Sequence, residues 1–315
     1  MDPALRLDAL VTPLRREVVS GASVVARMAC DVLLHAVTGV DAGSLSELRR
    51  ALSRLGTLIL DAQPAMAPLV VLVGDTLRAL EAATDLEDGR AAAREAVSAF
   101  RRGIEERTDH AAARTAALLP TEGAVLTLSG SATVLAALMR GAGLASRRVI
   151  VLESRPMLEG HRTAVALAEA GVRVTVAVDA AVAALVPGCA AVLLGADSVG
   201  DMGVVNKLGS LAAAEAARRA GVPVVVAADR TKILPPGFPQ PTSDDRPPDE
   251  VMRPRSGVTV WNRYFEAVPL DAVTWLVTDT ADLTPADLAQ YRRGIPVPEE
   301  VRAWAAGRAA RGATQ

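Results

Sequence analysis

Aromatic side chains are scarce in this sequence: three Trp, two Tyr and three Phe make up 3% of its 315 residues. Proteins that bind nucleic acids usually carry an excess of basic residues or aromatic rings that stack on bases. Neither feature is present, because 34 Lys and Arg residues face 36 Asp and Glu residues and leave a net charge of -2. We therefore expect no direct binding of nucleic acid.

Cysteine is also rare. Cys30 and Cys189 lie among apolar neighbours without a spaced framework, which argues against a disulfide scaffold or a zinc module. The longest uncharged runs, Gly123–Met139 and Ala180–Ala196, hold 17 residues each and fall short of the roughly 20 needed to span a bilayer. The first residues are charged and lack the apolar core of a signal peptide. We expect a cytoplasmic protein without a membrane span, a metal or a cofactor.

Half of the residues are apolar, mostly Ala, Val and Leu, so a large core is available. In residues 1–117 apolar residues recur at steps of three and four, for example at Leu45, Leu48, Leu52 and Leu55. This spacing predicts amphipathic helices. We therefore predict a helical N-terminal domain over residues 1–117.

The pattern changes at Pro120. Short apolar runs rich in β-branched residues alternate with helical stretches, which predicts an α/β fold with a Rossmann-like, doubly wound parallel sheet over residues 118–290. The expected strands are Ala124–Leu128, Val149–Leu152, Val172–Val178, Ala191–Leu194, Val222–Ala227 and Val273–Val277. Leu234–Gly257 holds seven prolines and predicts a long loop. Residues 291–315 are expected to form a C-terminal helical tail.

Several expected strands are followed by residues that suit an anionic ligand. In a parallel sheet, the strand ends and the helix N-termini that follow them meet at one edge. The turn Ser129–Gly130–Ser131 after the first strand suits a phosphate, or it simply caps the next helix. Arg155 and Arg162 follow the second strand and suit phosphate or carboxylate, or they pair with neighbouring glutamates.

The densest signal follows the fourth strand. Asp197 stands at the end of a buried strand, a position that packing alone explains poorly. Asn206 and Lys207 are expected to open the next helix, where an amide and an ammonium group could converge on a phosphate. Lys232 follows the fifth strand in the same manner.

These segments together resemble one family. It contains the regulatory alpha, beta and delta subunits of eukaryotic initiation factor 2B, ribose-1,5-bisphosphate isomerase and methylthioribose-1-phosphate isomerase. The resemblance rests on the order SRPxxEG, GAD, NKxG and NxxFExxP, and covers most of residues 15–280. The matching stretches are Ser20–Gly21–Ala22, Leu126–Ser129, Ser154–Arg162, Gly195–Asp197, Asn206–Gly209 and Asn262–Pro269.

The resemblance implies a phosphorylated sugar or a nucleotide as the ligand, and a homodimer or a dimer-based hexamer. The family's isomerases use an Asp and a Cys to convert a cyclic 1-phosphorylated aldose into a ketose 1-phosphate. The aspartate corresponds to Asp197, but the cysteine position holds Ser129. The implied ligand-binding residues are Gly21, Ala22, Ser131, Arg155, Arg162, Asn206, Lys207 and Lys232.

Two hypotheses remain open at this point, besides a third one, a purely structural assembly subunit with an empty pocket. Ser20 and Gln63–Pro64–Ala65 stand where the isomerases typically carry phosphate-binding arginines, and a serine hydroxyl is a poorer acid than a tuned thiol. The chain is either a sugar-phosphate isomerase that works with Asp197 and Ser129, or a non-catalytic regulatory subunit that binds a sugar phosphate or nucleotide.

Overall fold

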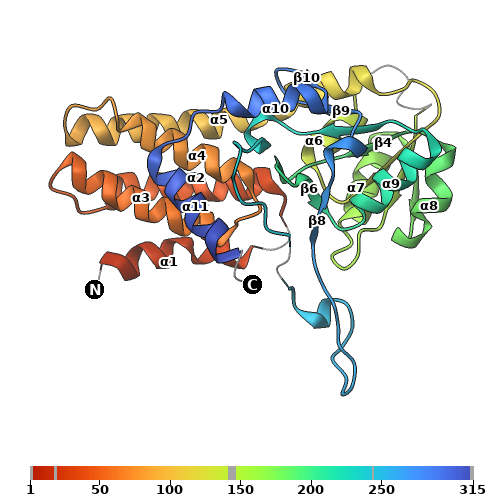
Figure 1. The fold of residues 1–315 in the computed structure, drawn as a ribbon, viewed down its shortest axis with the longest axis horizontal. Coiled ribbons are helices and arrows are strands. Elements are labelled where there is room, and N and C mark those ends of the chain that lie inside the picture. The colour runs from red at the N-terminus through yellow and green to blue at the C-terminus, as the bar shows by residue number, and fades with distance from the viewer. Residues whose placement is uncertain (1–2, 18–19, 141–146, 243–244, 313–315) are drawn as a thin grey trace. The chain divides into compact units, whose positions relative to one another are not determined.

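The computed structural model describes residues 3–17, 20–140, 147–242 and 245–312 (Figure 1). The chain divides into two compact units: unit 1 comprises Met1–Glu106, Thr231–Pro239 and Arg292–Gln315, and unit 2 comprises Arg107–Arg230 and Gln240–Tyr291. The division falls within the long helix α5 (Leu86–Leu118). The three sequence domains, 1–117, 118–290 and 291–315, stay a prediction.

Unit 1 is helical, as the sequence predicts. Its helices are α1 (Pro3–Arg16), α2 (Ala22–Gly39), α3 (Leu45–Ala62), α4 (Ala67–Ala79), the first part of α5, and α11 (Glu299–Gly312). The α3 helix begins where Ser44 Oγ accepts the Glu47 N–H, a typical N-cap. The C-terminal helix α11 packs on α3 and α4, and Trp304 Nε1 donates to Asp61 at 2.9 Å.

One described helix, α2, is long and apolar enough to cross a membrane by length and composition alone. It nevertheless packs against α1, α3 and α4, and its buried residues include Val25, Ala29 and Leu33. Its Arg27 pairs with Glu105 at 2.7 Å. A core helix of a helical unit has these same properties, so the expected absence of a membrane span stays a prediction.

Unit 2 is built on a seven-stranded sheet whose order is β10-β9-β7-β4-β1-β2-β3. The strands are β1 (Ala124–Leu128), β2 (Arg148–Leu152), β3 (Arg173–Ala177), β4 (Cys189–Leu194), β7 (Val224–Ala227), β9 (Trp275–Val277) and β10 (Asp282–Leu283). Neighbouring strands pair in parallel, except that β10 pairs antiparallel with β9. All six predicted strands are present, so the predicted α/β class is confirmed.

The strand order reverses between β1 and β4. Such a reversal opens a crevice at the carboxyl ends of the strands, where α/β proteins bind ligands. The helices of unit 2 are α6 (Ala132–Leu138), α7 (Glu159–Glu169), α8 (Val182–Leu185), α9 (Ser210–Ala220) and α10 (Pro285–Arg293), the last of which ends in unit 1. Short 3-10 segments lie at Asp179–Ala181, Val186–Gly188, Arg230–Lys232, Pro248–Glu250 and Leu270–Ala272.

A second, three-stranded sheet corrects one prediction. It consists of β5 (Ser198–Gly200), β6 (Gly203–Lys207) and β8 (Phe265–Val268), all antiparallel. Asn206 and Lys207 therefore end a strand and do not open a helix. The cause is Gly203, whose φ of +105° allows the turn between β5 and β6, and at which a Cβ would lie 2.1 Å from the Val268 carbonyl oxygen.

Candidate functional site

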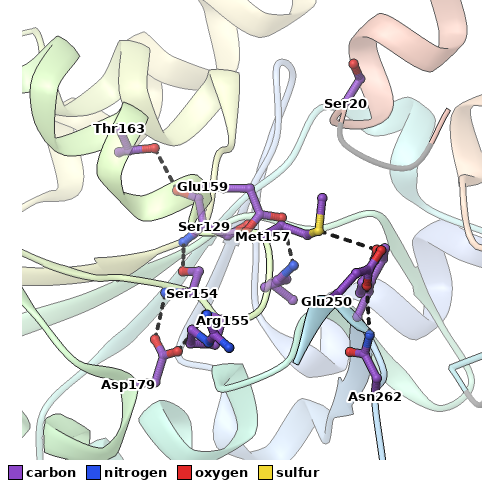
Figure 2. Close-up of polar contacts among 12 residues, drawn as sticks. Ser20, Ser129, Ser154, Arg155, Met157, Glu159, Thr163, Asp179, Glu250 and Asn262 are labelled. Atoms are coloured by element: carbon purple, nitrogen blue, oxygen red, sulfur yellow. Dashed lines mark hydrogen bonds and ion pairs between the residues drawn. The ribbon is translucent and has the colours of Figure 1, made fainter. Parts of the chain in front are cut away.

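The turn after β1 is held by the side-chain hydroxyls of Ser154 and Thr163. The Ser129 N–H donates to Ser154 Oγ at 2.7 Å, and the Ser129 carbonyl accepts from Thr163 Oγ1 at 2.7 Å (Figure 2). Both Ser129 and Ser154 have a φ of 65°, a left-handed conformation that is uncommon for residues other than glycine. Such strained positions concentrate at functional sites. The half-buried Ser129 is thus fixed at the carboxyl end of β1.

Three further sequence-predicted residues meet at the end of β4. A Cβ added to Gly195 would lie 2.8 Å from Ser131 Oγ and 3.7 Å from Asn206 Oδ1, so these side chains adjoin the glycine. The Asp197 N–H donates to the Val205 carbonyl at 2.9 Å, and its carboxylate is half-buried. The structure therefore brings Ser131, Asn206 and the strand end that carries Asp197 together at the β1/β4 switch point.

Lys207 lies in a buried ion pair next to this switch point. Its Nζ is 2.7 Å from Glu159 Oε1, and the two side chains are only 4% and 10% exposed. The Nζ also lies 4.7 Å from the centroid of the Tyr264 ring, within the range of a cation–π contact. The Glu159 Cβ is 3.5 Å from the position of a Cβ on Gly130, which places the pair beside the turn after β1.

The proline-rich loop contacts the same residues. Glu250 accepts hydrogen bonds from the Tyr264 hydroxyl at 2.5 Å and from Asn262 Nδ2 at 2.7 Å, the latter shown in Figure 2. Burial, together with the bond to Glu250, raises the pKa of Tyr264, so the phenol stays protonated at neutral pH. This part of the predicted loop is thus tied to β8 and to the surroundings of Lys207.

The turn after β2 binds a carboxylate of the protein itself, that of Asp179. Asp179 accepts from the Ser154 N–H at 2.8 Å and from the Arg155 N–H at 2.7 Å (Figure 2). The Arg155 guanidinium donates to the Val251 carbonyl of the proline-rich loop at 3.1 Å. Arg162 is exposed on α7. The described contacts therefore direct Arg155 toward the loop.

The N-terminus of α9 is also occupied by a carboxylate. Glu266 Oε1 on β8 accepts from the Gly209 N–H at 2.7 Å and from the Leu211 N–H at 2.8 Å. A carboxylate is stabilised there because the first N–H groups of a helix lack partners within it and carry partial positive charge. This bond ties α9 to the small sheet, directly after Lys207.

The remaining predicted residues lie in unit 1. Gly21 is the N-cap of α2 and Ala22 its first residue, whereas Lys232 is buried at the end of a 3-10 segment. Their role in ligand binding stays a prediction. Among the residues that the structure describes, no group of three or more His, Cys, Asp or Glu could hold a metal ion.

Sequence reasoning missed Glu159 as a partner of Lys207, and it missed Asp179, Glu250 and Thr163. Asp179 could have been found, because it stands just past the β3 strand in the same manner as Asp197. Glu250 gave no signal, since it lies in an irregular loop whose path depends on tertiary contacts.

The fold defines an α/β protein with a candidate functional site at the carboxyl edge of a Rossmann-like sheet. The chain belongs to the Initiation factor 2 subunit family, whose model matches residues 18–285. The resemblance inferred from the sequence motifs is thereby confirmed.

Several curated relatives of this chain are sugar-phosphate isomerases. The chain is 31% identical over 294 residues to the methylthioribose-1-phosphate isomerase of Geobacillus kaustophilus, covering 83% of this chain and 79% of the relative. It is 34% identical over 145 residues to the ribose 1,5-bisphosphate isomerase of Archaeoglobus fulgidus, covering 44% and 46%. The chain thus spans about half the length of the ribose 1,5-bisphosphate isomerases that it matches.

Solved structures share the fold. The translation initiation factor eIF-2B of Pyrococcus horikoshii OT3 has a TM-score of 0.74 and 25% sequence identity, with 89% of this chain and 97% of that chain covered. The similarity therefore extends over both the helical region and the α/β sheet.

Proposed function

We propose that this protein binds a phosphorylated pentose or a related sugar phosphate at the β1/β4 switch point and isomerises it from the aldose to the ketose form. The observation that carries the proposal is the convergence of Ser129, Ser131, Asn206 and the Asp197 strand end at one edge of the sheet. The relatives named as isomerases of ribose 1,5-bisphosphate and methylthioribose 1-phosphate support it.

The chemistry requires two positioned groups. A proton delivered to the ring oxygen breaks its bond to C1 and opens the cyclic 1-phosphorylated aldose. A hydride then moves from C2 to C1 with its electron pair, and the C2 hydroxyl becomes a carbonyl as its proton returns to the protein. C1 is reduced, C2 is oxidised, and no proton is gained or lost overall. We assign these proton movements to Asp197 and Ser129, and phosphate binding to Asn206, Lys207 and the Ser131 turn.

The direct test is phosphorus NMR of the purified protein incubated with ribose 1,5-bisphosphate over hours. A growing ketose-phosphate resonance is the expected result. Broadened but unchanged substrate resonances would indicate binding without turnover. Sharp and unchanged resonances would contradict both binding and catalysis for this sugar.

A non-catalytic regulatory subunit is the second candidate, and two observations favour it. Ser129 stands at the position of the catalytic cysteine that the family resemblance implies. A serine hydroxyl does not ordinarily ionise near neutral pH. Lys207 already has an anionic partner in Glu159. Under this proposal the site binds a sugar phosphate or nucleotide and leaves it intact.

We also propose that the protein is cytoplasmic and forms a homodimer or a dimer-based hexamer. Exposed apolar side chains in unit 2 support self-association, among them Val165 on α7, Val176 on β3 and Trp261, which is 59% exposed. Cys30 and Cys189 are buried and are not joined in a disulfide in the part of the chain that the structure describes, which suits a reducing compartment. Light scattering after size-exclusion chromatography measures the oligomer; a monomer at all concentrations would contradict it.

A further inference from the structure

The positive charge of Lys207 is already matched inside the protein. Its ammonium group is 2.7 Å from Glu159 Oε1 and lies over the Tyr264 ring, and both charged side chains are nine-tenths or more buried. In such surroundings an ion pair is screened little by water, so its two charges hold each other strongly. A ligand phosphate that reaches Lys207 must therefore compete with Glu159 for the same ammonium group.

The pair is nevertheless incomplete. Glu159 uses one carboxylate oxygen for Lys207, while its other oxygen, Oε2, is buried without a hydrogen-bond partner among the described residues. A buried acceptor without a partner destabilises the arrangement that holds it. The Glu159 carboxylate is thus held by a single hydrogen bond within the described part of the chain, and a phosphate could displace it from Lys207.

The other internal anions of this edge differ from Glu159. Asp179 uses both of its oxygens on the Ser154 and Arg155 N–H groups, and Glu266 bonds two N–H groups at the start of α9. These two carboxylates organise the backbone. Glu159 alone of the three neutralises a side-chain cation that the proposed function assigns to phosphate.

We propose that Glu159 is a specificity-determining residue that lowers the affinity of the site for phosphate by occupying Lys207. The inference rests on the proposed function, because it assumes that ligand phosphate binds next to Lys207. Glu159 thereby sets how strongly a phosphorylated ligand is held. Removal of its charge turns Lys207 into an unpaired, buried cation that requires an anion.

The test compares two variants of opposite charge, Glu159→Gln and Lys207→Met, by thermal unfolding with increasing inorganic phosphate at constant ionic strength. Each variant leaves one buried charge without its partner, so each should unfold roughly 10 °C below the parent. Phosphate should raise the Tm of Glu159→Gln in a dose-dependent manner, at concentrations at least about tenfold lower than any effect on the parent. It should leave Lys207→Met unchanged.

Glu169→Gln is the matched control, because it removes one negative charge from the exposed far end of the same helix. It should respond to phosphate as the parent does. Equal responses of the parent, Glu159→Gln and Glu169→Gln would overturn the proposal. Should Glu159→Gln not fold, Glu159→Asp draws the carboxylate back from Lys207 by one methylene group and so weakens the pair. It should gain phosphate affinity over the parent, and no gain would likewise overturn the proposal.

The outcome is separable from that of the proposed function. Conversion of ribose 1,5-bisphosphate by the parent, with no phosphate effect on Glu159→Gln, would keep the isomerase and reject the role of Glu159. Phosphate rescue of Glu159→Gln, with neither binding nor conversion of the bisphosphate by the parent, would keep the role of Glu159 and reject the isomerase.

Discussion

The two sheets of unit 2 contribute to the site in opposite ways. The segments that follow β1 and β4 of the large sheet carry Ser129 and Asp197, which are both half-buried, although the Asp197 N–H bonds to β6 of the small sheet. The small antiparallel sheet supplies Lys207 and Glu266, whose charges are already matched within the protein. Changes at the edge of the large sheet should therefore affect chemistry more than stability, and changes in the small sheet should affect stability first.

The largest effect on chemistry is expected for Asp197→Asn. The amide keeps the shape of the carboxylate but cannot donate and accept a proton in the same manner, so turnover of ribose 1,5-bisphosphate should fall by about 10²–10⁴-fold. Steady-state kinetics measure this loss, and urea unfolding checks that stability changes less than for Glu266→Gln. Unaltered binding and turnover would show that Asp197 is not part of the site.

The small sheet should respond in the opposite sense. Glu266→Gln replaces a charged acceptor of the Gly209 and Leu211 N–H groups by a neutral one, which should cost about 2 kcal/mol of unfolding free energy in urea. Glu215→Gln on α9 is the control: its pair with Arg218 lies at the surface, so its loss should lower the unfolding free energy far less than Glu266→Gln does. Equal costs would remove the distinction between the two sheets.

A gain of function would sharpen the comparison further. Ser129→Cys places a thiol at the fixed turn after β1, and a thiol titrates closer to neutral pH than a hydroxyl does. We expect roughly tenfold more isomerase turnover than in the parent, or the appearance of turnover where the parent has none. Ser131→Cys, two residues along the same turn, should bring no gain. Equal activities of Ser129→Cys and the parent would contradict the assignment of Ser129.

The large sheet was predictable from sequence and the small sheet was not. Strands such as Ala124–Leu128 are buried on both faces and read as continuous apolar runs. The β6 strand begins at Gly203 and ends in the polar pair Asn206 and Lys207, so its polar end resembled the start of a helix. Its pairing with β8 joins segments some sixty residues apart, and local patterns carry no information on such pairing.

The same limit applies to the charges of the site. Sequence position indicated that Asp197 follows a strand, because strand ends can be found from apolar runs, but it wrongly placed Lys207 at the start of a helix. It did not indicate that Lys207 pairs with Glu159, since that contact depends on how α7 packs beside β6. The motifs thus predicted which residues gather at the edge, whereas only the structure shows which charges are already matched.

The smallest expected effect concerns Tyr264. Its pKa is raised by burial and by its bond to Glu250, so the folded protein holds this proton more tightly than the unfolded chain does. The stability that this contributes is complete below about pH 10, the ordinary tyrosine pKa, and is lost as the pH rises further. Urea unfolding at about pH 9 and about pH 11 should show a steeper loss of stability for the parent than for Tyr264→Phe. The comparison uses the pH slope, because Tyr264→Phe also removes the hydrogen bond to Glu250 at every pH. Equal slopes would mean that burial and the bond to Glu250 do not hold the phenol neutral.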